Sequence, residues 1–184
     1  MKTTITFFLM FLSLNLVLAQ DDWKTIKDLE KGFRVDFPGE SKPDMTDVPT
    51  EKGTVKMHTN TYTPAVSSDD KNAIYMTAYT QYSSEMFDND LKNVEEKQEI
   101  LTKAVSGAVT NTKGTLLRTD KLEFNGFQAR ESVIEISGGY VIQSFMVLAD
   151  LRLYLLQAIC KKEDINNDKY VKFIGSFELI KTAE

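Results

Sequence analysis

Apolar and polar residues alternate in several short stretches of the first half of the chain, which is typical of strands with one buried face. Residues 33–37 alternate in this way, and Pro38-Gly39 ends the stretch. Residues 53–62 and 73–82 alternate next, with a turn rich in Ser and Asp at 64–72 between them. We therefore predict three strands, of which the second and third form a hairpin.

Between residues 91 and 109 the apolar positions recur every three or four residues, which predicts one apolar stripe on a long helix. Glu99 and Lys103 lie four residues apart on its polar side and are expected to pair. We expect Asp88-Asn89-Asp90 to cap the helix at its start and Gly114 to end it. A lead-in at 21–31 has apolar residues at helical spacing and predicts one helical turn.

Strand patterns return at 115–124 and 127–136, joined by Asn125-Gly126, a dipeptide that favours a tight hairpin turn. Two nearly continuous apolar stretches, 140–149 and 151–160, predict strands in the middle of the sheet. Residues 164–175 predict a second helix with a polar N-terminal cap. The predicted fold class is α+β, an antiparallel sheet of about six or seven strands flanked by one long and one shorter helix.

The N-terminus has the parts of a secretory signal peptide at residues 1–19. Lys2 gives a positive start, a predominantly apolar run follows, and Ala19 is a small residue before the polar Gln20. A membrane-spanning helix needs about 20 apolar residues, and this run is shorter. We predict cleavage between Ala19 and Gln20, an exported protein that is periplasmic or secreted, one domain over residues 20–184, and no stable membrane anchor after cleavage.

The 184 residues include 22 Lys and Arg against 27 Asp and Glu, a net charge of −5. An acidic chain is poorly suited to nucleic acid, so we expect no nucleic-acid partner. A single cysteine, Cys160, excludes an intramolecular disulfide. Because Cys160 lies in an apolar strand pattern, we expect a buried thiol, and the alternative is a reactive thiol or a disulfide to another molecule.

No arrangement of residues predicts catalysis, and we assign no catalytic, cofactor-binding or metal-binding residue. His58 is the only histidine, so a serine-type triad would have to use it, but its polar neighbours indicate a surface position. One His and one Cys are too few for a structural zinc site. Residues 164–168 begin like a calcium loop, but Lys169 and Gly175 stand where that loop needs Gly and an acid. Carboxylate pairs that only the fold could assemble stay an open alternative.

Tyr75 and Tyr79 are the candidate binding residues. They share one face of the predicted strand 73–82, opposite Ile74 and Met76. If no other element covers this face, it would form a binding surface. If one does, the two tyrosines pack in the core, and the sequence leaves both interpretations open.

Short motifs spread over most of the chain resemble those of small exported proteins with the PsbP/Mog1-like fold. They are Trp23 with Gly32, residues 33–39, Gly53, the hairpin at 125–130, residues 151–154 and the ending 173–177. The resemblance implies an antiparallel sheet flanked by helices, with accessory, assembly or binding roles. No catalytic residue is implied by it.

Three functional hypotheses follow. The first is a non-enzymatic accessory or assembly protein that contacts an envelope or secreted protein of unknown identity and needs no cofactor. The second is a small-ligand or lipid binding protein with a cavity between sheet and helix. The third is a hydrolase whose carboxylates, or His58, are assembled by the fold.

Overall fold

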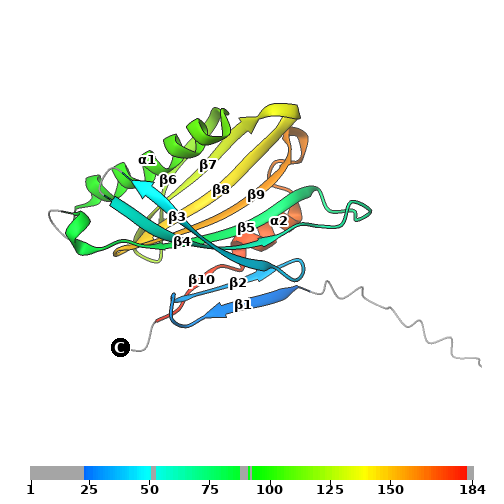
Figure 1. Ribbon diagram of the computed structural model, residues 1–184. Helices are drawn as coiled ribbons and strands as arrows, with labels where there is room; N and C mark the ends of the chain where they lie inside the picture. The colour runs from blue at the N-terminus through cyan, green and yellow to red at the C-terminus, as the bar shows by residue number, and fades with distance from the viewer. Residues whose placement is uncertain (1–22, 51–52, 88–90, 92, 182–184) are drawn as a thin grey trace, which may run out of the picture.

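The alternating stretches of the sequence form two antiparallel sheets. The computed structural model describes residues 23–50, 53–87, 91 and 93–181, so the predicted signal peptide, its cleavage point at Ala19 and Gln20, and the predicted cap at 88–90 lie outside the described residues. The larger sheet has the strand order β3-β4-β5-β9-β8-β7-β6, and the smaller has the order β1-β2-β10 (Figure 1). The strands are β1 Lys24–Asp28, β2 Phe33–Phe37, β3 Lys42–Thr50, β4 Gly53–Tyr62, β5 Asn72–Gln81, β6 Thr115–Phe124, β7 Phe127–Ile136, β8 Tyr140–Ala149, β9 Arg152–Lys161 and β10 Glu178–Leu179.

The two most apolar strands lie where the sequence predicts them, in the middle of the larger sheet. β9 is the central strand, with β5 on one side and β8 on the other. Every residue of β8 after Tyr140 is buried, because a strand covered on both faces has no solvent side on which to place polar residues. The turn between β6 and β7 is also confirmed, since Asn125 and Gly126 both adopt positive φ (52° and 84°), as a tight hairpin turn requires.

The long helix, α1, spans Val94–Thr112. The side chain of Asn93 caps it by accepting a hydrogen bond from the Glu95 backbone N–H (2.9 Å). The left-handed residue that caps the C-terminus of the helix is Lys113 (φ 52°), one residue before the predicted Gly114. Gly114 instead allows a close approach to β7, because a Cβ there would lie 2.6 Å from Cγ2 of Ile134.

The lead-in before Gly32 is a strand and not the predicted helical turn. Residues 24–28 form β1, and each pairs with a residue of β2, with Ile26 opposite Val35. A single helical turn fixes several residues for one hydrogen bond. Pairing along all of β1 satisfies more backbone groups and places Ile26 against the core.

β3 has no counterpart among the predicted strands. Pro43 and Pro49 interrupt its pattern, and proline cannot donate a hydrogen bond to a neighbouring strand. The strand nevertheless forms, because β3 is an edge strand that pairs only with β4. At an edge, a missing N–H can point towards solvent without cost to the sheet.

The second helix, α2 (Asp168–Gly175), and the smaller sheet cover one face of the larger sheet (Figure 1). The core between them is largely aromatic. It includes Phe33 and Phe37 of β2, Tyr75, Tyr79, Phe145 and Tyr154 of the larger sheet, and Phe173 and Phe177 from the C-terminal part. The predicted α+β class is therefore confirmed, with a seven-stranded antiparallel sheet, one long helix and one shorter helix, and the three-stranded sheet is an addition to it.

Candidate binding groove

The face of the larger sheet opposite the aromatic core is covered only in part. α1 packs on this face mainly against β7, with further contacts to β6 and β8 (Figure 1). Gln98 fixes the helix there, because its Oε1 accepts a hydrogen bond from Arg130 of β7 (2.8 Å) and its Nε2 donates one to Gln128 (2.8 Å). The same face of β4, β5 and β9 is left beside the helix, and a groove lies between them.

The groove has a volume of about 1090 Å³, slightly above the roughly 300–1,000 Å³ typical of ligand pockets. Its walls are mostly apolar. Met57, Met76, Leu153 and Leu155 come from the sheet, Ile100, Ala104 and Gly107 from α1, and Met86 and Phe87 from the segment between β5 and α1. Apart from the glycine, these side chains are half-buried and so still have apolar surface to cover.

Four methionines line the groove. Met57, Met76 and Met146 come from three strands, and Met86 comes from the 3₁₀ turn Ser84–Met86. Met146 is buried at the base, and the other three are half-buried. Methionine is flexible and polarisable and adapts to differently shaped partners, so these walls suit a binding surface.

Gly107 of α1 lines the groove at a position where its neighbours do not require glycine. A Cβ at this position would meet nothing within 4 Å, and Gly107 has no positive φ. Glycine inside a helix costs roughly 0.5–1 kcal/mol relative to alanine. Packing therefore does not account for Gly107, and its effect is to widen the groove.

Three charged side chains border the groove. Glu99 and Lys103 pair with each other (3.3 Å). Glu96 is half-buried and makes no ion pair or hydrogen bond through its carboxylate with any residue that the structure describes. The border therefore carries one carboxylate more than it has positive charges.

Tyr75 and Tyr79 lie on the covered face of the sheet. Tyr75 is fully buried, with its ring 5.3 Å from that of Phe173, and the ring of Tyr79 lies 5.4 Å from that of Tyr154. Of the two interpretations that the sequence leaves open, the structure therefore supports core packing for both tyrosines. The open groove is on the other face of the same strand, the face of Met76.

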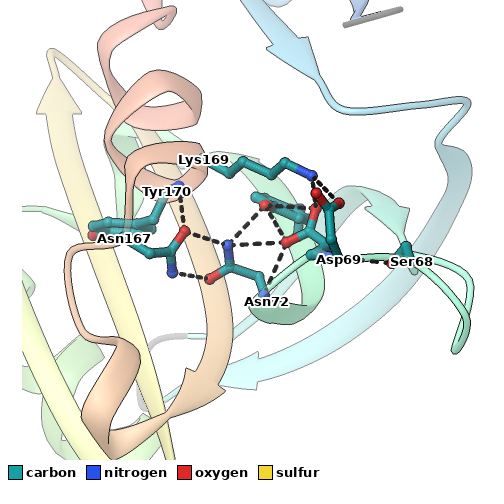
Figure 2. Close-up of polar contacts among 8 residues, drawn as sticks. Ser68, Asp69, Asn72, Asn167, Lys169 and Tyr170 are labelled. Atoms are coloured by element: carbon teal, nitrogen blue, oxygen red, sulfur yellow. Dashed lines mark hydrogen bonds and ion pairs between the residues drawn. The ribbon is translucent and has the colours of Figure 1, made fainter. Parts of the chain in front are cut away.

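A second group of polar residues joins the end of the β4–β5 turn and the first residues of β5 to the start of α2 (Figure 2). Asn72 and Asn167 exchange two amide hydrogen bonds, Nδ2 to Oδ1 in each direction, at 2.8 and 2.9 Å. The Tyr75 hydroxyl donates to Asp70 (2.9 Å), and Lys169 pairs with Asp69 (3.2 Å) and Asp70 (3.6 Å). Asn167 also caps α2 by accepting from the Tyr170 N–H (3.1 Å).

The polar groups of this cluster form hydrogen bonds mainly with one another. Asn72 is 1% exposed, and the carboxylate of Asp70 is held by Tyr75 and by the backbone N–H of Asn72. Burial, followed by the nearby charge of Asp70, raises the pKa of Tyr75 well above its usual value. Its hydroxyl therefore stays protonated and donates a hydrogen bond, so the cluster holds two parts of the fold together.

His58 lies apart from the groove's main walls. It is half-buried, borders a hollow of about 320 Å³, and its ring centroid is 6.2 Å from that of Tyr79. It makes no hydrogen bond with a described Ser, Asp or Glu, so the triad hypothesis gains no support.

In the part of the chain that the structure describes, no three His, Cys, Asp or Glu side chains are grouped as metal ligands. Within the same residues, no helix is long and apolar enough to cross a membrane.

Cys160 is fully buried, as the sequence predicts, and Gln143 donates a hydrogen bond to its Sγ (3.2 Å). Burial, followed by the charge of Asp164, raises the pKa of the thiol to about 11. Since only the thiolate reacts, we expect the native protein to react with Ellman's reagent at pH 8 at least about 100-fold more slowly than the unfolded chain. The rate should still rise with pH above 9, where the unfolded chain levels off, and a fast native reaction at pH 8 would refute a buried thiol.

Comparison with known proteins gives a likeness in structure only. No family model matches the chain, and no curated protein sequence matches it. Among solved structures, the solution structure of cyanobacterial PsbP (CyanoP) from Synechocystis sp. PCC 6803 matches with a TM-score of 0.52 and 10% sequence identity. The match covers 86% of this chain and 93% of that one. The chain therefore has a PsbP-like fold.

Proposed function

We propose that the chain is an exported, non-enzymatic accessory protein that binds the apolar surface of a partner in the groove between α1 and the larger sheet. The observation that carries this proposal is the groove of about 1090 Å³ with half-buried apolar walls. Export rests on the predicted signal peptide at residues 1–19. The PsbP-like fold is consistent with an accessory role.

Two features favour a binding site over an accidental gap in packing. Concave and mostly apolar surface is typical of binding sites, and here it continues from β4 across β5 and β9. Gly107 adds an independent argument, because the helix gives up local stability at a position that borders the groove. Such departures from local preference are expected at functional sites.

The substitution Gly107→Phe should place a large side chain in the groove and obstruct it without harming the fold. The Gly107→Phe side chain would extend into open space, and phenylalanine is a better helix former than glycine. We expect wild-type protein to bind the neutral apolar dye Nile red, and the variant to bind it about tenfold or more weakly, which corresponds to about 1.4 kcal/mol. Fluorescence titration measures the affinity, and thermal unfolding should show an unchanged or higher midpoint.

Gly175→Phe is the matched control. Gly175 is the last residue of α2, and a Cβ there also meets nothing within 4 Å, but it does not line the groove. This variant should bind Nile red as the wild type does. Equal dye binding by wild type and Gly107→Phe would remove the groove as the binding site.

A small apolar ligand or a lipid is the second candidate, and the volume and apolar walls of the groove favour it. Protein that is purified under native conditions from the cells that naturally produce it would then release a defined apolar molecule on denaturation. Mass spectrometry of the organic extract, with Gly107→Phe as the comparison, detects such a molecule.

A further inference from the structure

The shape and charge of the groove indicate what kind of partner fills it. We infer that the occupant is a basic amphipathic helix of a partner protein, which lies along α1 with its apolar side towards the sheet. This inference rests on the proposed function, because it assumes that the groove is the binding site. It adds the structure of the bound segment and the sign of its charge.

The length of the groove fits a helix of moderate size. Residues of α1 from Glu96 to Asn111 line it, and at a rise of 1.5 Å per residue this wall is about 22 Å long. A partner helix of about 15 residues has the same length. Its apolar residues at positions i, i+3, i+4 and i+7 would form the single stripe that a groove of this kind accommodates.

The walls can adapt to helices with different apolar side chains. Three half-buried methionines, Met57, Met76 and Met86, can change rotamer to fit leucine-sized or aromatic side chains. Ala104 and Gly107 are among the small residues on the α1 side. Small residues allow the axis of a second helix to come close to α1.

The charges on the border select a basic partner. Glu96 is half-buried and its carboxylate is unpaired among the described residues, whereas Lys103 is paired with Glu99. A Lys or Arg on the margin of the bound helix would supply the missing partner for Glu96. The carboxylate of a fatty acid or an anionic lipid headgroup would instead be placed beside Glu96, so the same feature disfavours these ligands.

Glu95 and Glu96 both lie in the first turn of α1, where the helix dipole favours acidic residues. The dipole accounts for the charge of both residues but not for the difference between them. Glu95 is exposed and does not line the groove, whereas Glu96 is half-buried in its wall. The two residues therefore form a matched pair for a test.

The experiment compares two synthetic amphipathic peptides of about 15 residues that share one leucine stripe. One carries lysine on its polar face, and the other carries glutamate. We expect the basic peptide to bind with at least about tenfold higher affinity in fluorescence anisotropy and to become helical in circular dichroism. Glu96→Gln should remove most of this preference, Glu95→Gln should leave it, and Gly107→Phe should abolish binding of both peptides.

The outcomes separate this inference from the function on which it rests. Equal binding of the two peptides, or equal effects of Glu95→Gln and Glu96→Gln, overturns the basic helix as the occupant. Nile red binding that Gly107→Phe blocks, together with no binding of either peptide, also overturns it but leaves the groove as an apolar binding site. If Nile red does not bind either, the proposed function fails as well.

Discussion

Replacement of Phe173 with alanine is expected to lower the free energy of unfolding by about 3–5 kcal/mol. Phe173 is fully buried between α2 and the two sheets, with ring centroids 5.1 Å from Phe37 and 5.3 Å from Tyr75. Its removal leaves a cavity beside two rings that come from different parts of the sequence. These neighbours cannot close the space by moving a single element, so the cost should lie near the upper end of the range.

Urea denaturation of the wild type and the variant measures this loss. Val171→Ala is the matched control in the same helix, because Val171 is 56% exposed. Alanine is also the better helix former, so the control should change stability by no more than about 0.5 kcal/mol. A loss below about 1 kcal/mol for Phe173→Ala would show that α2 does not hold the aromatic core together.

Replacement of Asn167 with alanine is expected to cost about 2–4 kcal/mol. The change removes the cap of α2, which contributes about 1 kcal/mol. It also leaves the amide of Asn72, 1% exposed, without its partner, for a further loss of about 1–3 kcal/mol. Both losses arise from one side chain, because Asn167 belongs to the cap and to the amide pair at once (Figure 2).

Asn167→Ser separates the two contributions. Serine still caps a helix but cannot exchange two hydrogen bonds with Asn72, so it should lose less stability than alanine does, by about 1 kcal/mol. A double-mutant cycle with Asn72→Ala measures the coupling between the two amides directly. Additive losses in that cycle would contradict the exchanged amide pair.

The strands were predictable where one local pattern decides their structure. The hairpin turn at Asn125-Gly126 and the apolar runs of β8 and β9 carry their own signals, in turn chemistry and in hydrophobic content. The stretch 24–28 was predicted wrongly because five residues do not distinguish a helical turn from a strand. Its partner, β2, decides the matter.

The groove could not be found from the sequence in the same way. Alternation shows that Tyr75 and Met76 face opposite sides of β5, but it does not show which side α2, the small sheet or α1 will cover. That depends on contacts between distant residues, such as Gln98 with Arg130 and Asn72 with Asn167, which lies 95 residues away. The one local signal was Gly107, a glycine within a helical pattern with no cap or turn to explain it.

The contacts between β2 and the C-terminal elements also govern when the protein can fold. β2 pairs with β10, its Phe37 packs on Phe173, and the Asp36 N–H donates to Ser176 Oγ, 140 residues later. During synthesis, residues 33–37 therefore have no completed core until residues 173–179 have left the ribosome, and such distant contacts form slowly. The aromatic core is therefore the part of the molecule that closes last, after the larger sheet, whose final strand β9 ends at Lys161.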